Sequence, residues 1–215
     1  MIPGPDQIIS CPHCKGLAKY RTLTSGNTLG ATVRSDGKKI FPMLPLPPAV
    51  VKCQHCKMGY WLVDAEEVGT VDLWGEKNQK VNPEWAAAKK VEEPTEEEYY
   101  LFIDAKLAKT PQQEKTLRIL AWWRRNDVHR TQEEANLSIS DACRENLEEL
   151  LKLIDQENDE GQLMKGEVLR ELGQFEDAKQ VLDSVASAKY AYIVRQILSL
   201  CANKDSRVSK LQLGT

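Results

Sequence analysis

Two Cys-x-x-Cys pairs stand near the start of the chain, Cys11-Pro12-His13-Cys14 and Cys53-Gln54-His55-Cys56, with 38 residues between them. Two intervening residues let a tight turn direct both sulfurs of a pair at one ion about 2.3 Å away, and a second pair completes a tetrahedron. We therefore predict one zinc ion with Cys11, Cys14, Cys53 and Cys56 as its ligands. Four thiolates leave no open position for water or substrate, so we expect a structural ion.

A redox reading of the first pair is the main chemical alternative. Cys11-Pro12-His13-Cys14 has the same residue types as the active motif of the periplasmic disulfide oxidases of the thioredoxin family, in which a helix N-terminus and the histidine lower the pKa of the first thiol. That motif follows a buried strand and opens a helix, whereas Lys15-Gly16 follow here and a second pair comes later. Thiol–disulfide exchange by Cys11 and Cys14 is therefore our third hypothesis.

The residues beside the cysteines suggest supporting roles. His13 and His55 occupy equivalent positions inside the two pairs. Since four thiolates already saturate the ion, we expect the histidine ring nitrogens to bond backbone or water. Lys15 and Lys57, each following the second cysteine of a pair, can offset the −2 net charge of a zinc tetrathiolate.

The elements that must position these cysteines are short strands. Residues 17–24, 28–34 and 38–41 have strand-like composition and are separated by Ser25-Gly26-Asn27 and Ser35-Asp36-Gly37, which predict hairpins with glycine at positive φ in the turns. The order strand, cysteine pair, hairpin, extended return, cysteine pair and strand resembles a zinc ribbon over roughly residues 8 to 68. That resemblance implies a small β domain at residues 1–68 with the four cysteines as its ligands.

An acidic connector and then helices are expected to follow the β domain. Residues 69–94 are acidic and contain several Gly and Pro residues, with a short helix expected around 83–88. Thr95 and Thr110 each have the spacing of a helix N-cap, and a third start is expected near Ser138 or Ser140. We expect the helix after Thr110 to stop at Asn126. Apolar residues at helical spacing predict an all-α domain over residues 95–215, so the fold class is α+β.

One helical segment resembles a tetratricopeptide repeat. In Gly166–Ala178, Gly166 fits the small residue at which the two helices of that repeat pass closely, residues 173–175 fit its turn, and Ala178 fits the small residue opening its second helix. Lys165 stands where a leucine is usual, and no proline closes the unit. The resemblance implies one repeat around residues 162–195, covered by the earlier helices and by one at about 188–202, and a protein-binding surface.

Charge is distributed unevenly along the chain. Residues 1–63 hold eight Lys/Arg against two Asp/Glu, whereas residues 64–110 hold six against twelve. Basic side chains near Tyr and Trp could meet phosphates and bases, so a nucleic-acid-binding ribbon with a helical regulatory domain is our second hypothesis. A Trp/Arg cluster in the helical half is also typical of protein interfaces. The candidate interaction residues are Lys19, Arg21, Lys38, Lys39, Trp122, Trp123, Arg124 and Arg125.

The remaining features exclude several function classes. The chain has no phosphate loop, nucleophile elbow, zinc-protease motif or dinucleotide fingerprint, so we expect no enzymatic activity. No segment approaches the ~20 consecutive apolar residues of a membrane helix, and the N-terminus lacks a secretion signal, so we expect a cytoplasmic protein without a membrane contact. Our leading hypothesis is a non-enzymatic, zinc-binding adaptor for a protein partner; the sequence does not specify its oligomeric state.

Overall fold

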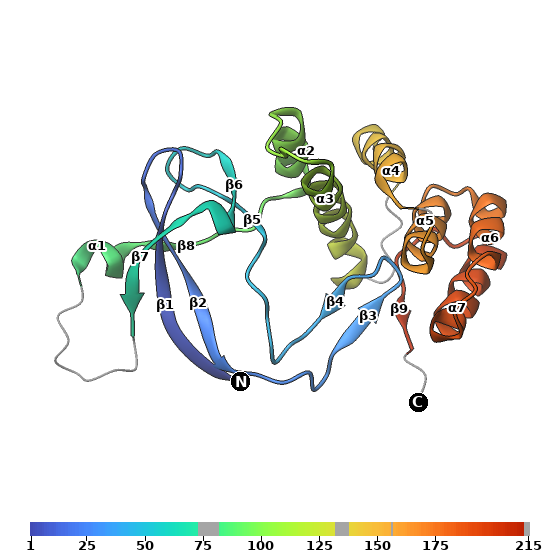
Figure 1. Ribbon diagram of the computed structural model, residues 1–215, viewed down its shortest axis with the longest axis horizontal. Coiled ribbons are helices and arrows are strands. Elements are labelled where there is room, and N and C mark those ends of the chain that lie inside the picture. The colour runs from blue at the N-terminus through green and yellow to red at the C-terminus, as the bar shows by residue number, and fades with distance from the viewer. Residues whose placement is uncertain (73–81, 132–137, 156, 213–215) are drawn as a thin grey trace. The chain divides into compact units, whose positions relative to one another are not determined.

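The computed structural model describes residues 1–72, 82–131, 138–155 and 157–212, with the side chains of residues 129 and 131 left out. It divides into two compact units, which we call the cysteine unit (residues 1–31 and 41–98) and the helical unit (residues 32–40 and 99–215). Figure 1 labels the elements of both. Residues 73–81 of the expected connector lie outside the described residues. The α+β fold class is confirmed.

The cysteine unit is built from a four-stranded sheet and a separate two-stranded hairpin. The sheet has the order β7-β1-β2-β8, and β1 pairs antiparallel with both β2 and β7. In the hairpin, β5 pairs antiparallel with β6. The strands are β1 (Ile2–Ser10), β2 (Leu17–Ser25), β5 (Val50–Lys52), β6 (Gly59–Trp61), β7 (Glu66–Val71) and β8 (Lys89–Lys90); η1 (Leu62–Asp64) and the expected short helix, α1 (Pro83–Ala87), complete the unit.

The small core of this unit includes two of the cysteines. Ile9, Val51 and Tyr60 pack with Cys11 and Cys53, and all five side chains are buried. Each cysteine pair lies in the turn of a hairpin: Ser10 is opposite Leu17 across the first turn, and Lys52 is opposite Gly59 across the second. At both turns, the residue before the first cysteine therefore pairs with the third residue after the second cysteine.

One expected hairpin is not formed. We predicted a turn at residues 25–27 joining two paired strands, but β2 pairs with β1 and β8 and not with the strand that follows it. Gly26 does not serve as a positive-φ turn residue; a Cβ atom there would lie 2.5 Å from the backbone oxygen of Met43. The glycine therefore permits a close approach of two backbone segments, which composition alone does not distinguish from a turn.

The second expected hairpin is present but belongs to the helical unit. β3 (Thr32–Arg34) pairs antiparallel with β4 (Lys39–Ile40), and Gly37 has φ +78° in the connecting turn. The other edge of β3 pairs with β9 (Lys210–Leu211) near the C-terminus, which gives a sheet of order β4-β3-β9. Residues 32–40 lie between the two cysteine pairs in sequence, but they belong to the helical unit. We had expected them in the β domain of residues 1–68.

The helices begin where their capping residues predict. Thr95 and Glu98 cap each other's amides at the start of the first helix, Thr110 accepts from the amide of Gln113, and Ser140 accepts from that of Cys143. The boundary between the units falls inside α2. The helices are α2 (Glu96–Asp104), α3 (Pro111–Thr131), α4 (Asp141–Leu153), α5 (Asp159–Glu171), α6 (Phe175–Asp183) and α7 (Ala191–Ala202), the last preceded by η2 (Ala188–Tyr190).

The expected end of α3 at Asn126 is wrong, because α3 continues to Thr131. Asn126 is buried, and its side-chain amide donates to the carboxylates of Asp36 and Glu171. Because its side chain binds these remote carboxylates, it does not compete for the hydrogen bonds of the local backbone, and the helix continues through Asn126.

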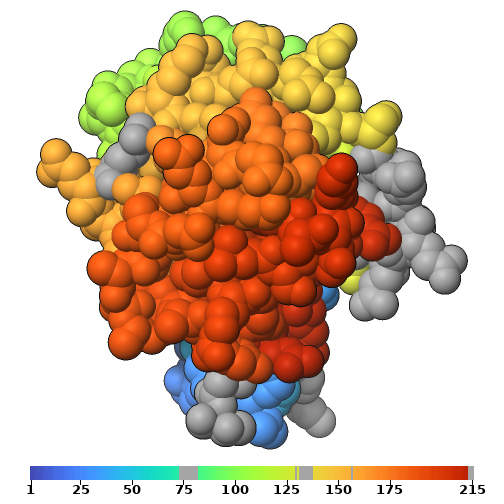
Figure 2. Space-filling model, turned by 90° about the vertical axis from the view of Figure 1, so that its right-hand side faces the viewer, coloured from blue at the N-terminus to red at the C-terminus, as the bar shows by residue number. Residues whose placement is uncertain are grey.

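The C-terminal helices pack as the sequence predicts. Leu147, Leu150 and Val168 join Trp122 in one apolar cluster, and α6 and α7 form a second cluster with α5. Gly166 allows α5 to approach α6, since a Cβ atom there would lie 2.6 Å from Leu182, and Gly173 adopts φ +80° in the turn between them. Figure 2 shows these helices as a continuous surface from yellow to red. None of the described helices has the length and apolar character needed to cross a bilayer.

Candidate metal centre

Both cysteine pairs adopt the same turn. The Cys11 amide donates to the Gly16 carbonyl at 3.0 Å, and the Lys15 amide donates to the Cys11 carbonyl at 2.9 Å. The second turn repeats this pattern five residues and four residues after Cys53, at 3.0 and 2.9 Å. Lys15 and Lys57 have φ 60° and 65°, the left-handed conformation that reverses the chain after the second cysteine. The two turns are therefore equivalent in backbone as well as in sequence.

The four sulfurs converge on one point. The ligand atoms of Cys11, Cys14, Cys53 and Cys56 all lie within 4.8 Å of one another. Across the two turns, the Sγ atoms of Cys11 and Cys56 are 3.9 Å apart, and those of Cys14 and Cys53 are 3.6 Å apart. A tetrahedron with metal–sulfur bonds of 2.3 Å has edges of about 3.8 Å, so this spacing fits a tetrathiolate metal site.

The pKa values of the thiols differ within the cluster. Burial raises the pKa of Cys11 to about 12 and also raises the pKa of Cys56. Burial acts in the same direction on Cys53, but hydrogen bonds from the backbone amides of Cys56 and His55 lower its pKa to about 7. Four adjacent thiolates therefore need a bound cation to share their charge, and metal binding must release protons. Affinity should consequently fall as the pH falls.

The two histidines cross-link the turns. His13 Nε2 lies 3.2 Å from the carbonyl of Gly59, three residues beyond Cys56, and His55 Nε2 lies 3.3 Å from the carbonyl of Leu17, three residues beyond Cys14. Each histidine thus reaches the strand that leaves the other turn. The expectation that the rings bond to backbone is confirmed, and both rings are engaged away from the sulfurs.

One glycine makes room for this arrangement. A Cβ atom on Gly16 would lie 2.5 Å from Cδ2 of His55, so a larger residue would displace the ring. The equivalent position in the second turn is Met58, which is exposed. Lys15 has its ammonium 3.6 Å from the carboxylate of Glu66, and both side chains are largely exposed.

The structure places the sequence-predicted interaction residues of the cysteine unit apart from the metal cluster. Lys19 donates to the carbonyl of Ala86 at 3.0 Å, and Arg21 lies 3.4 Å from the buried carboxylate of Asp6. Both are therefore engaged within their own unit.

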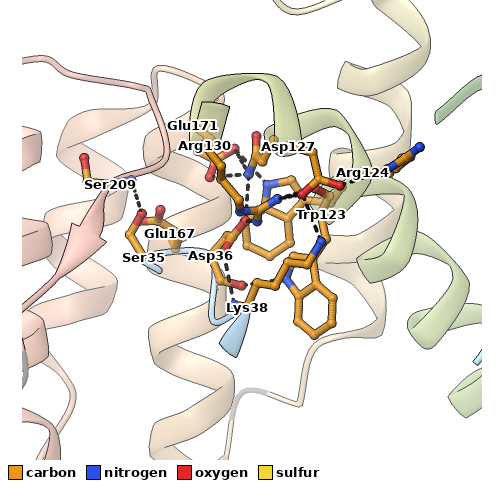
Figure 3. A network of polar contacts seen from close by, with 12 residues as sticks. Ser35, Asp36, Lys38, Trp123, Arg124, Asp127, Arg130, Glu167, Glu171 and Ser209 are labelled. Carbon is orange, nitrogen blue, oxygen red and sulfur yellow. Dashed lines mark hydrogen bonds and ion pairs between the residues drawn. The ribbon is translucent and has the colours of Figure 1, made fainter. Parts of the chain in front are cut away.

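A polar network in the helical unit, which Figure 3 shows, includes four of the six predicted residues of that unit: Lys38, Trp122, Trp123 and Arg124. Trp122 is fully buried and donates to Glu171 at 2.8 Å, whereas the half-buried Trp123 donates to the Asp36 carbonyl at 2.9 Å. Asp127 accepts from Lys38 at 2.9 Å and from Arg124 at 3.3 Å. Arg125 is buried and donates to the carbonyl of Ser138 at 3.3 Å, and Lys39 is exposed.

The network centres on Asp36 from the turn between β3 and β4. One carboxylate oxygen accepts from the amide of Lys38 at 3.0 Å, and the other accepts from Asn126 at 3.0 Å and pairs with Arg130. Burial raises the pKa of Asp36, although Arg130 and Asn126 act in the opposite direction. The ionised form therefore depends on these two partners.

A second part of the network lies on α5. Arg170 is fully buried and pairs with Glu167 at 2.6 Å, and it also donates to the backbone carbonyls of Asp205 and Arg207. Burial, reinforced by the charge of Glu167, raises the pKa of Glu171 to about 8. Burial therefore favours the protonated form of Glu171 inside the helical unit.

Sequence reasoning missed Ser35, Asp36, Glu167, Arg170 and Glu171 as members of one network. The signal on α5 was present, because charged residues spaced i, i+3 and i+4 interrupt the apolar run of Val168, Leu169 and Leu172. The partner segment gave no such signal. Ser35 and Arg170 are 135 positions apart, and a Ser-Asp-Gly turn ordinarily indicates only a local reversal.

Comparisons of the chain with protein-family models, with curated proteins and with solved structures found no match.

Proposed function

We propose that the protein is a non-enzymatic adaptor in which the four cysteines hold one structural zinc ion and the helical unit binds a protein partner. The donor set carries the zinc proposal. Four sulfurs at tetrahedral spacing match the soft, closed coordination that zinc adopts in structural sites, and they leave no position for a reacting molecule. This arrangement would supply folding energy and no catalysis.

The cysteine geometry also separates this proposal from thiol–disulfide exchange. A redox pair needs one exposed, activated thiol next to its own partner. Here Cys11 is buried with a raised pKa, and the thiol with the lowered pKa, Cys53, belongs to the other pair. The motif also lies in a hairpin turn between β1 and β2 and not at the start of a helix.

Charge placement favours a protein partner over nucleic acid. Three of the eight basic residues before position 64, namely Arg34, Lys38 and Lys39, belong to the helical unit. Of the others, Lys15, Arg21 and Lys52 are each within 4 Å of a carboxylate in the cysteine unit. By sequence the cysteine unit holds nine Lys/Arg against twelve Asp/Glu. A net negative unit is a poor platform for a phosphate backbone.

The helix pair α5 and α6 supports the choice of partner class. The close contact at Gly166 and the left-handed Gly173 are the two features that a tetratricopeptide-like hairpin requires. Arrays of such hairpins bind peptides or proteins on their helical faces. We propose that α5 to α7 form a short array of this kind.

Metal analysis of the purified full chain tests the first half of the proposal. We expect one zinc ion per chain, with four of the six thiols protected from a thiol reagent until a chelator is added. Cys143 and Cys201 are buried outside the cluster and supply the internal reference for slow, metal-independent reaction. Rapid reaction of Cys11 and Cys14 in the zinc-loaded chain, with catalysed disulfide exchange, would reject a structural site.

Affinity capture from the native cell, with and without nuclease, tests the second half. We expect a stoichiometric protein complex that nuclease does not dissolve. A direct titration with DNA and RNA over a salt series is the matched measurement. Binding that appears at low salt and weakens steeply as salt rises would favour the nucleic-acid hypothesis and contradict the adaptor.

A further inference from the structure

The helical unit contains a partly open cavity that is lined entirely by residues of this unit. Its volume is about 470 Å³, within the range of roughly 300–1,000 Å³ that is typical of small-molecule sites. Residues from β3, the following turn, β4, α5, η2, α7 and β9 line it. The floor is apolar and consists of Val33, Leu163, Met164, Ile193, Ile197 and Leu211.

The rim of the cavity carries an excess of positive charge. The lining contains three basic residues, Arg34, Lys39 and Lys189, and two acidic residues, Asp36 and Glu160. The Asp36 carboxylate pairs with Arg130, which lies outside the lining. Glu160 accepts from the Tyr190 hydroxyl at 2.6 Å and lies 3.9 Å from the Lys189 ammonium. Both carboxylates of the rim therefore already have cationic or hydrogen-bonding partners.

Arg34 is a cation of this lining with no matching anion among the described residues. Its Nε is buried and has no hydrogen-bond partner, and its guanidinium makes no ion pair within the described part of the chain. A guanidinium without an anion is a strong donor for a carboxylate that enters the cavity, because its planar group can hold a carboxylate by two parallel N–H···O bonds. Lys39 is exposed and also lines this cavity, so its positive charge adds to that of Arg34.

The two halves of the lining specify one kind of ligand. The apolar floor favours an alkyl or aryl body, and the Arg34 side of the rim favours a single negative head. We propose that this cavity binds a small amphipathic carboxylate, such as a medium-chain fatty acid, with its head group on Arg34 and Lys39 and its chain against Met164 and Ile193. An inorganic anion would satisfy the rim alone and leave the floor in water.

Methyl NMR of the full chain titrated with octanoate tests this site. The Met164 methyl lines the cavity and should shift saturably, whereas the exposed Met58 methyl in the cysteine unit should not move. Octanol and octylamine are the neutral and cationic probes of equal length. We expect octanol to bind at least about tenfold more weakly than octanoate and octylamine to cause no saturable shift.

Charge variants assign the head group. Arg34→Gln should raise the dissociation constant of octanoate at least about tenfold, while Arg144→Gln, at an exposed position on α4 outside the lining, should leave it unchanged. If Arg34→Gln disturbs the fold, Lys39→Gln replaces it, because Lys39 is exposed; a loss of several-fold is then expected. Octanol binding as tightly as octanoate, unchanged affinity in the folded variants, or no Met164 shift would each overturn the proposal.

Discussion

The two units hold distant parts of the chain together by different chemistry. In the cysteine unit, two hairpin turns meet where their four sulfurs lie at tetrahedral spacing around a position that could hold one ion. In the helical unit, a turn between β3 and β4 is held by carboxylates, guanidinium groups and an amide from α3 and α5. The first arrangement fails as a whole when one ligand is lost. The second distributes the same task over many contacts, so each loss should cost less.

The largest effect is expected from breaking the metal cluster. Cys53→Ala removes one of four ligands, and a structural zinc site contributes on the order of 10 kcal/mol to folding of a small module. The cysteine unit should lose the zinc ion that we propose there and its resistance to limited proteolysis. The helical unit should keep its own resistance, because its apolar clusters are formed by its own helices.

Cys143→Ala is the control for this substitution. Cys143 is equally buried but packs among apolar residues of the helical unit, so its loss should cost only about 1 kcal/mol and release no metal. A Cys53→Ala chain that is as protease-resistant as wild type would show that the cluster does not hold the unit together.

A smaller effect is expected at the centre of the network. Asp36→Ala removes the buried carboxylate that Arg130 and Asn126 share, which should lower the free energy of unfolding by about 3 kcal/mol. The loss is limited because Arg130 keeps its pair with Asp127. Urea unfolding followed by helical circular dichroism measures it.

The surface pair of Glu176 and Lys179 provides the control. Glu176→Ala removes a salt bridge whose carboxylate is 86% exposed, so the expected loss is much smaller than the loss at Asp36. Equal losses at Asp36 and Glu176 would mean that the network contributes no more than an exposed ion pair.

These two regions also differ in how far the sequence predicts them. The metal site depends on local spacing, because two cysteines separated by two residues can direct both sulfurs at one ion from a single tight turn. The caps at Thr95 and Ser140 are local in the same sense, and they too were predicted. By contrast, Asn126 was predicted as a helix end because its partners, Asp36 and Glu171, are remote in sequence. The turn at residues 35–37 was predicted, but nothing local indicates which unit it joins.

The pH dependence of stability should separate the two regions further. The pKa of Glu171 is raised to about 8 in the folded chain by burial and by Glu167, well above that of an unfolded glutamate. Above the unfolded pKa, the unfolded chain has lost a proton that the folded chain still holds. The free energy of unfolding should therefore fall as the pH rises toward about 8, by up to about 1.4 kcal/mol per unit.

Glu171→Gln isolates this contribution. The amide oxygen can still accept from Trp122 or Asn126, but the group no longer titrates. We expect the variant to lose most of the decline in stability between about pH 5 and pH 8 when urea unfolding is measured across that range. A wild-type stability that is flat over the same interval would contradict a protonated Glu171. Asp36, whose pKa is also raised, should leave a residual slope of the same sign.

The smallest effect is expected from the histidines that join the two cysteine turns. His13→Ala and His55→Ala each remove one hydrogen bond to a backbone carbonyl, at 3.2 and 3.3 Å, and leave all four sulfurs in place. Each should cost about 1 kcal/mol, or roughly fivefold in zinc affinity measured by chelator competition, and the two should cost the same because the turns are equivalent. A loss of several hundredfold in either variant would identify that histidine as a metal ligand. Unequal losses would instead show that the two turns differ in energy although their backbones match.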